Sequence, residues 1–355
     1  RDCLLSRGLG DVYKRQVLLS SCGSQRSKGD IQKLVPNIFL SDDALNCPYY
    51  MCVTDKYFIL GNVKGDTILD VFSLGGKRLN QFLFRGEGPN EVLHMMGIQY
   101  SSVDSCIYIP DASRHLMYRI LEQELENDNP FISTVFYYNP EKLPDESAIR
   151  DWWRYMSNDK LFAACASPKG MLSYFDKNMS DISFYENYPD KDKVNESLSE
   201  WAHIGLYQSC SAVSPNANNL IMAYYGSDIL GFVRLHGDDV SVNFQKKKLP
   251  NDIYVAQLGN GNMQGAYTGE SMRYYVCATA SDESVYILYN GKKNKDCVPG
   301  VTRGSIVKCY KWSGEWIRDL DLGKDMLQIV VSPDDKVLFA LESSEDGYLV
   351  LRYEL

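Results

Sequence analysis

Short apolar segments recur along the chain, each followed by a polar turn and a second apolar segment. In Met51–Leu60, for example, the turn Thr54-Asp55-Lys56 separates two apolar segments. Apolar segments of this length between Ser-, Asp- and Asn-rich turns are typical of β-strands. The unit occurs six times, at intervals of roughly 50 to 65 residues, which indicates a repeat architecture. The six copies span Met51–Leu60, Ile98–Ile109, Trp153–Ala164, Ser211–Ala223, Tyr275–Leu288 and Ile329–Leu341.

Further strand pairs follow most of these units and are joined by hairpin turns such as Gly75-Gly76-Lys77 and Ser313-Gly314. These pairs are Ile68–Ser73 with Leu79–Phe84, Met171–Phe175 with Ile182–Tyr185, Ile229–Leu235 with Val240–Phe244, and Ile306–Trp312 with Trp316–Leu320. Each repeat is thus about four antiparallel strands. Six such sheets around an axis bury both of their apolar faces, so we predict an all-β fold, a six-bladed β-propeller. The alternative is a pair of packed β-sandwiches, which the even recurrence and the lack of a linker disfavour.

The last repeat contains three strands, the third being Tyr348–Tyr353, before the sequence ends. An apolar segment near the start, Leu34–Ser41, can supply the fourth strand. Pairing of this segment with the last blade would close the ring and remove two exposed sheet edges. We therefore predict one propeller domain over residues 31–355.

The residues before the propeller divide into two segments. Asp11-Val12-Tyr13-Lys14-Arg15-Gln16 resembles the translation of a transposon-end tag used in sequencing libraries, and we interpret residues 1–16 as an artefact. Leu19-Ser20-Ser21-Cys22 resembles the lipobox at the end of a bacterial lipoprotein signal peptide, and the polar segment Gly23–Asp30 follows it. Residues 17–30 are therefore expected to be the remnant of a signal peptide and a tether.

This resemblance implies that Cys22 carries the lipid anchor. Two acyl chains on one cysteine suffice for stable attachment to a membrane. The expected location is the cell envelope of a Gram-negative bacterium. Serines and basic residues, not a run of acids, follow Cys22, which favours the periplasmic face over surface display.

Composition restricts the classes of partner. The chain has 37 Lys and Arg against 46 Asp and Glu, a net charge of −9, which argues against nucleic acid because phosphate binding needs a basic surface. No apolar run approaches the ~20 residues of a membrane span. Tyr is abundant, at 25 residues, but Tyr also favours strands. We expect a monomer.

The cysteines fit a packing role better than a metal site. Neither a Cys-x-x-Cys pair nor a zinc-like Cys and His spacing occurs in the sequence. Five cysteines lie in or beside apolar segments and are predicted to be small buried side chains. They are Cys52, Cys106, Cys165, Cys277 and Cys309. Bridges between Cys47 and Cys52 or between Cys297 and Cys309 remain open, since spacing alone establishes neither.

Long connections between blades are predicted at one face, and binding usually resides in such loops. They are Arg85–Met96, Asn139–Asp151, Glu186–Gln208 and Lys246–Arg273. The first contains Arg85-Gly86-Glu87-Gly88-Pro89-Asn90-Glu91, which resembles the G-x-G-P-G-E signature of TolB-like six-bladed propeller lipoproteins of uncharacterised function. Asn90 replaces the third glycine of that signature, and Asn tolerates a positive φ.

This loop has two interpretations. It can direct Arg85, Glu87 and Glu91 towards the central channel, with Asn90 at the bend. Alternatively, its glycines form the bend and Glu91 caps neighbouring backbone amides, which we favour. A carboxylate pair such as Glu87 and Glu91 could also hold Ca²⁺.

Four aromatic or imidazole side chains complete the candidate ligand-binding face. Trp201 and His203 lie in the third long loop and could stack on a sugar or peptide, although such residues more often pack on the rim of a blade. Tyr224 and Tyr225 stand at a hairpin on the same face and could line a pocket, or serve as ordinary strand residues.

The sequence contains no nucleophile elbow, phosphate-binding loop or zinc-protease motif, so we assign no catalytic residue and lean against an enzyme. The favoured interpretation is a binding module for a glycan, a peptide or an envelope protein, without a cofactor. The alternative is a hydrolase or lyase that uses Ca²⁺ or another divalent metal in the channel, an analogy that rests on fold alone.

Overall fold

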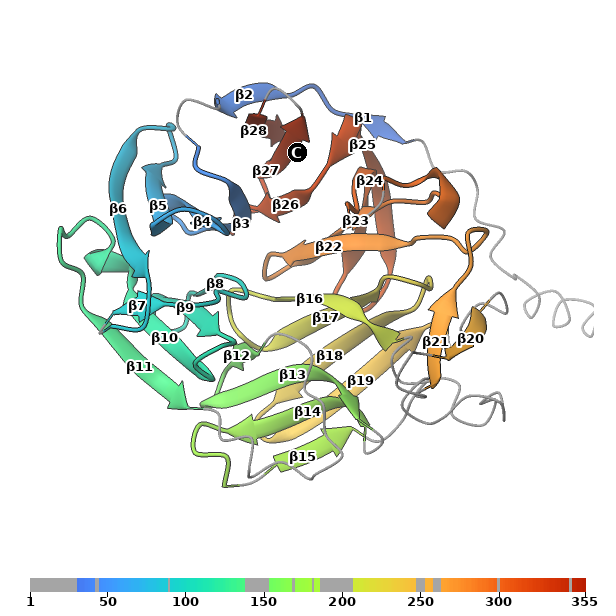
Figure 1. Ribbon diagram of the computed structural model, residues 1–355, viewed down its shortest axis with the longest axis horizontal. Coiled ribbons are helices and arrows are strands. Elements are labelled where there is room, and N and C mark those ends of the chain that lie inside the picture. Colours follow the sequence, from blue (N-terminus) through green and yellow to red (C-terminus); the bar gives the residue numbers. More distant parts are fainter. Residues whose placement is uncertain are drawn as a thin grey trace, which may run out of the picture. The chain divides into compact units, whose positions relative to one another are not determined.

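The computed structural model describes residues 31–41, 45–88, 90–137, 153–167, 170–180, 182–185, 207–246, 253–257, 263–298, 301–344 and 347–355. These residues form a six-bladed β-propeller of mainly antiparallel four-stranded sheets, as predicted (Figure 1). The predicted artefact, signal remnant and tether, including Cys22, lie outside the described residues. Among the described residues, no helix has the length and apolar character that crossing a membrane requires.

The first three blades follow one another along the chain. Blade 1 contains β3 (Pro48–Val53), β4 (Tyr57–Asn62), β5 (Thr67–Ser73), β6 (Arg78–Arg85) and β7 (Glu91–Val92). Blade 2 contains β8 (Gln99–Ser101), β9 (Cys106–Asp111), β10 (Leu116–Leu121) and β11 (Ile132–Tyr137), with a 3₁₀ helix, η2 (Glu122–Glu124). Blade 3 contains β12 (Arg154–Met156), β13 (Lys160–Ser167), β14 (Gly170–Asp176) and β15 (Ile182–Tyr185).

The last three blades include the two strands from the start of the propeller. Blade 4 contains β16 (Ser209–Val213), β17 (Asn219–Tyr224), β18 (Leu230–His236) and β19 (Asp239–Gln245). Blade 5 contains β22 (Tyr275–Ala280), β23 (Ser284–Tyr289), β24 (Gly304–Lys311), β25 (Trp316–Met326) and β1 (Gln32–Lys33), with the 3₁₀ helix η6 (Asn294–Asp296). Blade 6 contains β26 (Gln328–Val331), β27 (Val337–Ser344), β28 (Gly347–Glu354) and β2 (Asn37–Leu40).

Ring closure follows the prediction. β2 pairs antiparallel with β28, with Ile38 opposite Leu351 and Leu40 opposite Val350. The register shifts by one residue between Ile38 and Leu40, so their side chains do not share a face as a regular alternation would require. Ile38 is 67% exposed and Leu40 is 4% exposed.

In several repeats, the side chain of its first residue stabilises the turn between the two inner strands. Thr54 Oγ1 accepts hydrogen bonds from the backbone N–H groups of Lys56 (3.1 Å) and Tyr57 (3.0 Å). Ser281 Oγ does the same for its own turn, accepting from Glu283 N at 3.1 Å and from Ser284 N at 2.9 Å. These hydroxyl oxygens accept hydrogen bonds from backbone N–H groups that the strands leave unpaired, which is why Ser and Thr favour such turns.

Six hydrophobic clusters of described residues hold the ring together, one between each pair of neighbouring blades. Between blades 6 and 1, for example, Phe58 and Phe339 pack with their ring centroids 4.8 Å apart. The two inner strands of a blade contact clusters on both of their faces, so β4 is buried at all of its residues. Outer strands face solvent on one side, and β19 alternates between exposed and half-buried residues.

Two features differ from the sequence interpretation. The long connection Lys246–Arg273 contains a β-hairpin of β20 (Ile253–Gln257) and β21 (Met263–Tyr267). Tyr267 at the end of this hairpin packs against Gly226, where a Cβ would lie 2.0 Å from its ring. In addition, two short parallel pairs, β1 with β25 and β6 with β7, add a fifth strand to blades 5 and 1.

Candidate functional site

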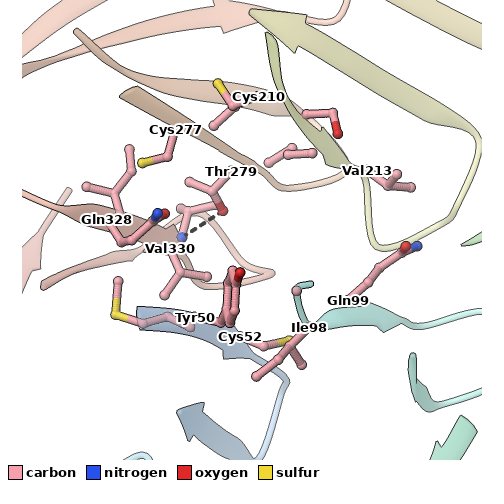
Figure 2. A pocket seen from close by; sticks show the side chains of 18 of the residues that line it. Tyr50, Cys52, Ile98, Gln99, Cys210, Val213, Cys277, Thr279, Gln328 and Val330 are labelled. Carbon is pink, nitrogen blue, oxygen red and sulfur yellow. Dashed lines mark hydrogen bonds between the residues drawn. The ribbon is translucent and has the colours of Figure 1, made fainter. Parts of the chain in front are cut away.

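A channel runs along the propeller axis and is lined by the innermost strands of the blades, β3, β8, β12, β16, β22 and β26. It has a volume of about 170 Å³. Figure 2 shows side chains from these strands around the open centre, among them Tyr50, Gln99, Cys210, Cys277 and Gln328. We call the end at which the innermost strands begin the upper end, and the end at which they finish the lower end.

The upper end is polar. Burial raises the pKa of the Tyr49 phenol, and a hydrogen bond with the Gln328 side chain acts in the opposite direction. The thiols of Cys277 and Cys210 lie close enough to raise that pKa further. Arg154, at the start of β12, is the one charged side chain among the described lining residues. Its guanidinium contacts the backbone oxygens of Trp153 at 3.4 Å and Ser211 at 3.3 Å.

The lower end is apolar. It is lined by Val53, Val213, Pro215, Ala280, Val331 and Pro333. Pro215 and Pro333 each follow the buried serine that organises its turn. A ligand that enters from above therefore meets polar groups first and aliphatic groups at depth.

Hydrogen bonds between blades fix the positions of the lining strands. The Gln99 side chain donates to Tyr155 O (2.6 Å) and accepts from Tyr155 N (3.0 Å), which joins blade 2 to blade 3. Thr279 Oγ1 accepts from Val331 N at 3.2 Å, which joins blade 5 to blade 6 (dashed line in Figure 2). Bonds within the protein thus fix the channel wall, as in preorganised sites.

The described cysteines are free thiols, so neither of the bridges left open by the sequence forms. Four of the five cysteines predicted to be small core residues are buried, and the side chain of Cys165 is not among those described. Burial raises the pKa of the Cys52 and Cys277 thiols to about 12, so both stay protonated at neutral pH. A buried protonated thiol is a poor nucleophile.

The paired tyrosines have different environments. Tyr224 is buried in the core, edge-on to Tyr207 with ring centroids 5.8 Å apart. Tyr225 lines the channel, and its backbone is held by Gln208 O and Tyr274 N. Trp201 and His203 lie outside the described residues, as do the connection Asn139–Asp151 and most of Glu186–Gln208.

The glycine-rich loop connects blades 1 and 2, and none of its candidate residues is among those that line the channel. Gly88 N donates to the Glu91 carboxylate at 2.6 Å. A Cβ on Gly86 would lie 2.0 Å from that carboxylate, so a larger residue there would displace the Glu91 side chain. Asn90 has φ = 60°, the left-handed conformation expected from its sequence position. Glu87 is exposed at the tip of the loop.

Side chains on both sides hold this loop in place. Arg85 donates to Gly65 O (3.2 Å) and Leu93 O (3.0 Å). From blade 2, Arg114 donates to the backbone oxygens of Gly88 (3.1 Å) and Glu91 (3.0 Å). The Tyr118 hydroxyl donates to Glu91 O at 2.7 Å. The loop therefore acts as a latch between two blades.

Among the described residues, no group of three or more His, Cys, Asp and Glu side chains is placed to hold a metal ion. The metal-dependent alternative stays a prediction, since His203 and parts of three long connections lie outside those residues.

Sequence comparison identifies the family. Residues 32–334 match the family described as TolB-like 6-blade propeller-like. The chain belongs to the TolB-like propeller family. This confirms the resemblance seen in the glycine-rich loop, and the match extends from β1 to the turn that follows β26.

Solved structures share the fold of this TolB-like propeller at low sequence identity. A DUF4221 family member from Bacteroides vulgatus ATCC 8482 is 11% identical, with a TM-score of 0.54 over 90% of this chain and 97% of that one. A Bacteroides fragilis NCTC 9343 protein, named as an exported protein, is 11% identical, with a TM-score of 0.54 over 93% of this chain and 96% of that one. Among curated proteins, none matches the sequence.

Several lining residues escaped the sequence analysis, namely Tyr49, Gln99, Arg154 and Gln328. The sequence does contain a signal for them. Each is a polar or amphipathic residue within or beside the first strand of a repeat, where neighbouring positions are apolar. An inner strand of a propeller has no neighbouring strand on its axial side, so such a side chain can face the channel.

Proposed function

We propose that this TolB-like propeller is a lipid-anchored binding module of the bacterial cell envelope that receives the end of a peptide chain in the upper part of its channel. The observation that carries this proposal is the charge of the lining. Arg154 is the one charged side chain among the described residues around the channel, and the upper end also carries phenols, amides and thiols beside the apolar Met96, Ile98 and Val276.

The size and chemistry of the channel favour a chain end. Sites for whole small molecules measure roughly 300–1,000 Å³, and this channel measures about 170 Å³, which suits one terminal residue. A guanidinium binds a carboxylate through two parallel hydrogen bonds. The phenol of Tyr49 and the amide of Gln328 can bond peptide N–H and C=O groups.

Titration calorimetry of the full chain with short peptides tests this site. We expect binding of peptides with a free C-terminal carboxylate, and at least tenfold weaker binding of the same peptides as C-terminal amides. Arg154→Met should weaken binding about 30-fold, because loss of one partner of an enclosed charge pair costs roughly 2 kcal/mol or more. Arg234→Met is the matched control, since Arg234 is exposed and does not line the channel. Equal affinity for acid and amide, or for the two variants, would contradict the proposal.

The anchor has its own test. In a chain with a complete signal peptide, Cys22→Ser should abolish incorporation of a labelled fatty acid and move the protein from the membrane fraction to the soluble fraction. Cys47→Ser serves as the control, because Cys47 is a free thiol within the propeller. The name of the Bacteroides fragilis protein, an exported protein, is in line with a location outside the cytoplasm. Unchanged labelling of the Cys22→Ser chain would remove the anchor from the proposal.

A further inference from the structure

A second cavity lies at the lower face, between blades 4 and 5. In both blades, the turn between the first and second strands and the turn between the third and fourth strands line it. The lining residues include Asn216, Gly237, Asp282 and Trp312. Its volume is about 540 Å³. That volume falls within the range of roughly 300–1,000 Å³ that ligand sites occupy. We call this cavity the lower groove.

Trp312 gives the lower groove an aromatic wall of fixed orientation. Its indole N–H donates to Ser281 O at 3.1 Å. Part of the side chain packs against the hydrophobic cluster between blades 4 and 5, while the residue remains half-buried and lines the groove. A tryptophan held in this way offers a flat apolar surface beside polar groups, a combination that favours amphipathic ligands.

Hydrogen bonds to the side-chain oxygens of two asparagines fix the orientation of their amide groups in the lower groove. Asn216 Oδ1 accepts from Asn218 N at 3.0 Å and from Ser214 Oγ at 2.7 Å. Asn218 Oδ1 accepts from Ser157 Oγ at 2.6 Å. The side-chain N–H groups of both asparagines have no acceptor among the described residues. They are donors in fixed positions at the edge of the cavity.

Charged groups of both signs complete the lining. They include Arg234, Asp282 and Glu283, whereas Lys311 Nζ is paired at 2.9 Å with Glu315, which does not line the groove. One Asp282 oxygen accepts from Asn216 N at 2.7 Å, which fixes that carboxylate. Within the described part of the chain, neither the Arg234 guanidinium nor the Glu283 carboxylate has a hydrogen-bond or ion-pair partner. The groove therefore presents hydrogen-bond donors and acceptors together.

We propose that the lower groove binds a neutral oligosaccharide. Sugar hydroxyls donate and accept hydrogen bonds at once, so they match a wall that carries both amide and guanidinium donors and carboxylate acceptors. The apolar face of a sugar ring matches the Trp312 indole. An acidic ligand would face the like charges of Asp282 and Glu283, and a basic ligand would face those of Arg234 and Lys311. This site is separate from the channel and does not depend on the peptide proposal.

Titration calorimetry of the full chain tests the groove with six neutral hexasaccharides as probes: malto-, cello-, xylo-, manno-, chito- and laminarihexaose. We expect at least one of them to bind with quenching of tryptophan fluorescence. Trp312→Ala should weaken that binding at least tenfold. Trp316→Ala is the matched control, because Trp316 lies on the same hairpin, is 39% exposed and does not line the groove.

Two further variants keep the test independent of folding. Glu283→Gln and Arg234→Gln change exposed side chains, so the chain should fold normally while its affinity for the sugar falls at least fivefold. Arg154→Met should leave sugar binding unchanged, which separates this site from the channel. Absence of binding by all six probes, equal affinity in Trp312→Ala and Trp316→Ala, or binding confined to an acidic oligosaccharide such as hexagalacturonate would overturn the proposal.

Discussion

Leu40→Asp is expected to destabilise the propeller by about 4 kcal/mol or more, whereas Ile38→Asp on the same strand should change the free energy of unfolding by about 0.5 kcal/mol at most. Leu40 is 4% exposed and belongs to the hydrophobic cluster between blades 6 and 1. An aspartate at this position would lose that contact area and place an unpaired carboxylate in an apolar environment. Ile38 is 67% exposed, so the same carboxylate would face water there.

The effect is large because β2 closes the ring. Its pairing with β28 joins the first residues of the propeller to the last, which are far apart in the sequence. Phe39, beside Leu40, packs on Phe58 of blade 1 and on Phe339 of blade 6, with ring centroids 5.0 and 4.8 Å apart. Release of the strand would expose the edge of β28 and uncover these rings. The loss therefore extends over two blades.

Urea unfolding of the two variants, followed by circular dichroism, measures the difference. Limited proteolysis provides a second measurement, because a detached β2 is open to cleavage before the blades unfold. Leu40→Asp should be cut near residue 36 at protease concentrations that leave Ile38→Asp intact. If both variants have the same urea midpoint as the parent chain, β2 does not hold the ring closed.

Much of this fold is predictable from sequence because a propeller repeats one local pattern. Buried turn hydroxyls recur at the same point of four repeats, at Thr54, Ser214, Ser281 and Ser332, and mark the hairpin between the two inner strands. The apolar segment at Asn37–Leu40 and the incomplete last blade together predict ring closure. The parallel pairs of β1 and β7 could not be predicted, since each involves two residues and has no periodicity of its own.

The candidate site was less predictable than the fold, for a geometric reason. The residues at the upper end of the channel come from six strands that are far apart in sequence, and only the closed ring brings them together. Tyr225 was found because its loop is on the correct face. Arg154 and Gln328 stand out as polar residues in apolar strands, but that pattern does not show which residues of distant strands lie beside them. The sequence likewise left the direction of the Glu91 side chain open, since it depends on the backbone path through Gly86 and Gly88.

The glycine-rich loop that joins blades 1 and 2 also depends on a buried carboxylate that the sequence did not reveal. Asp111, at the end of β9, is fully buried, and its carboxylate accepts hydrogen bonds from four backbone N–H groups. Two belong to the segment that follows the latch, Leu93 N at 2.8 Å and His94 N at 3.2 Å. The other two belong to the turn after β9, Ser113 N at 3.1 Å and Arg114 N at 3.2 Å. One carboxylate thus fastens the blade 1 connection to blade 2 and positions Arg114, which holds Gly88 and Glu91 from the other side.

Asp111→Ala is therefore expected to lower the free energy of unfolding by about 3 kcal/mol, because each buried donor without an acceptor costs roughly 1–3 kcal/mol and water can reach some of the four. Asp55→Ala is the matched control, since Asp55 is exposed in a turn at the lower face. This variant should change the free energy of unfolding by about 0.5 kcal/mol at most. Urea unfolding measures both values. Hydrogen exchange locates the effect, because the amides of Leu93 and His94 should exchange faster in Asp111→Ala while those of β17 and β27 in distant blades follow only the global change. Equal unfolding midpoints for the two variants would show that the backbone bridge between Met95 and Asp111, not the carboxylate, holds the latch.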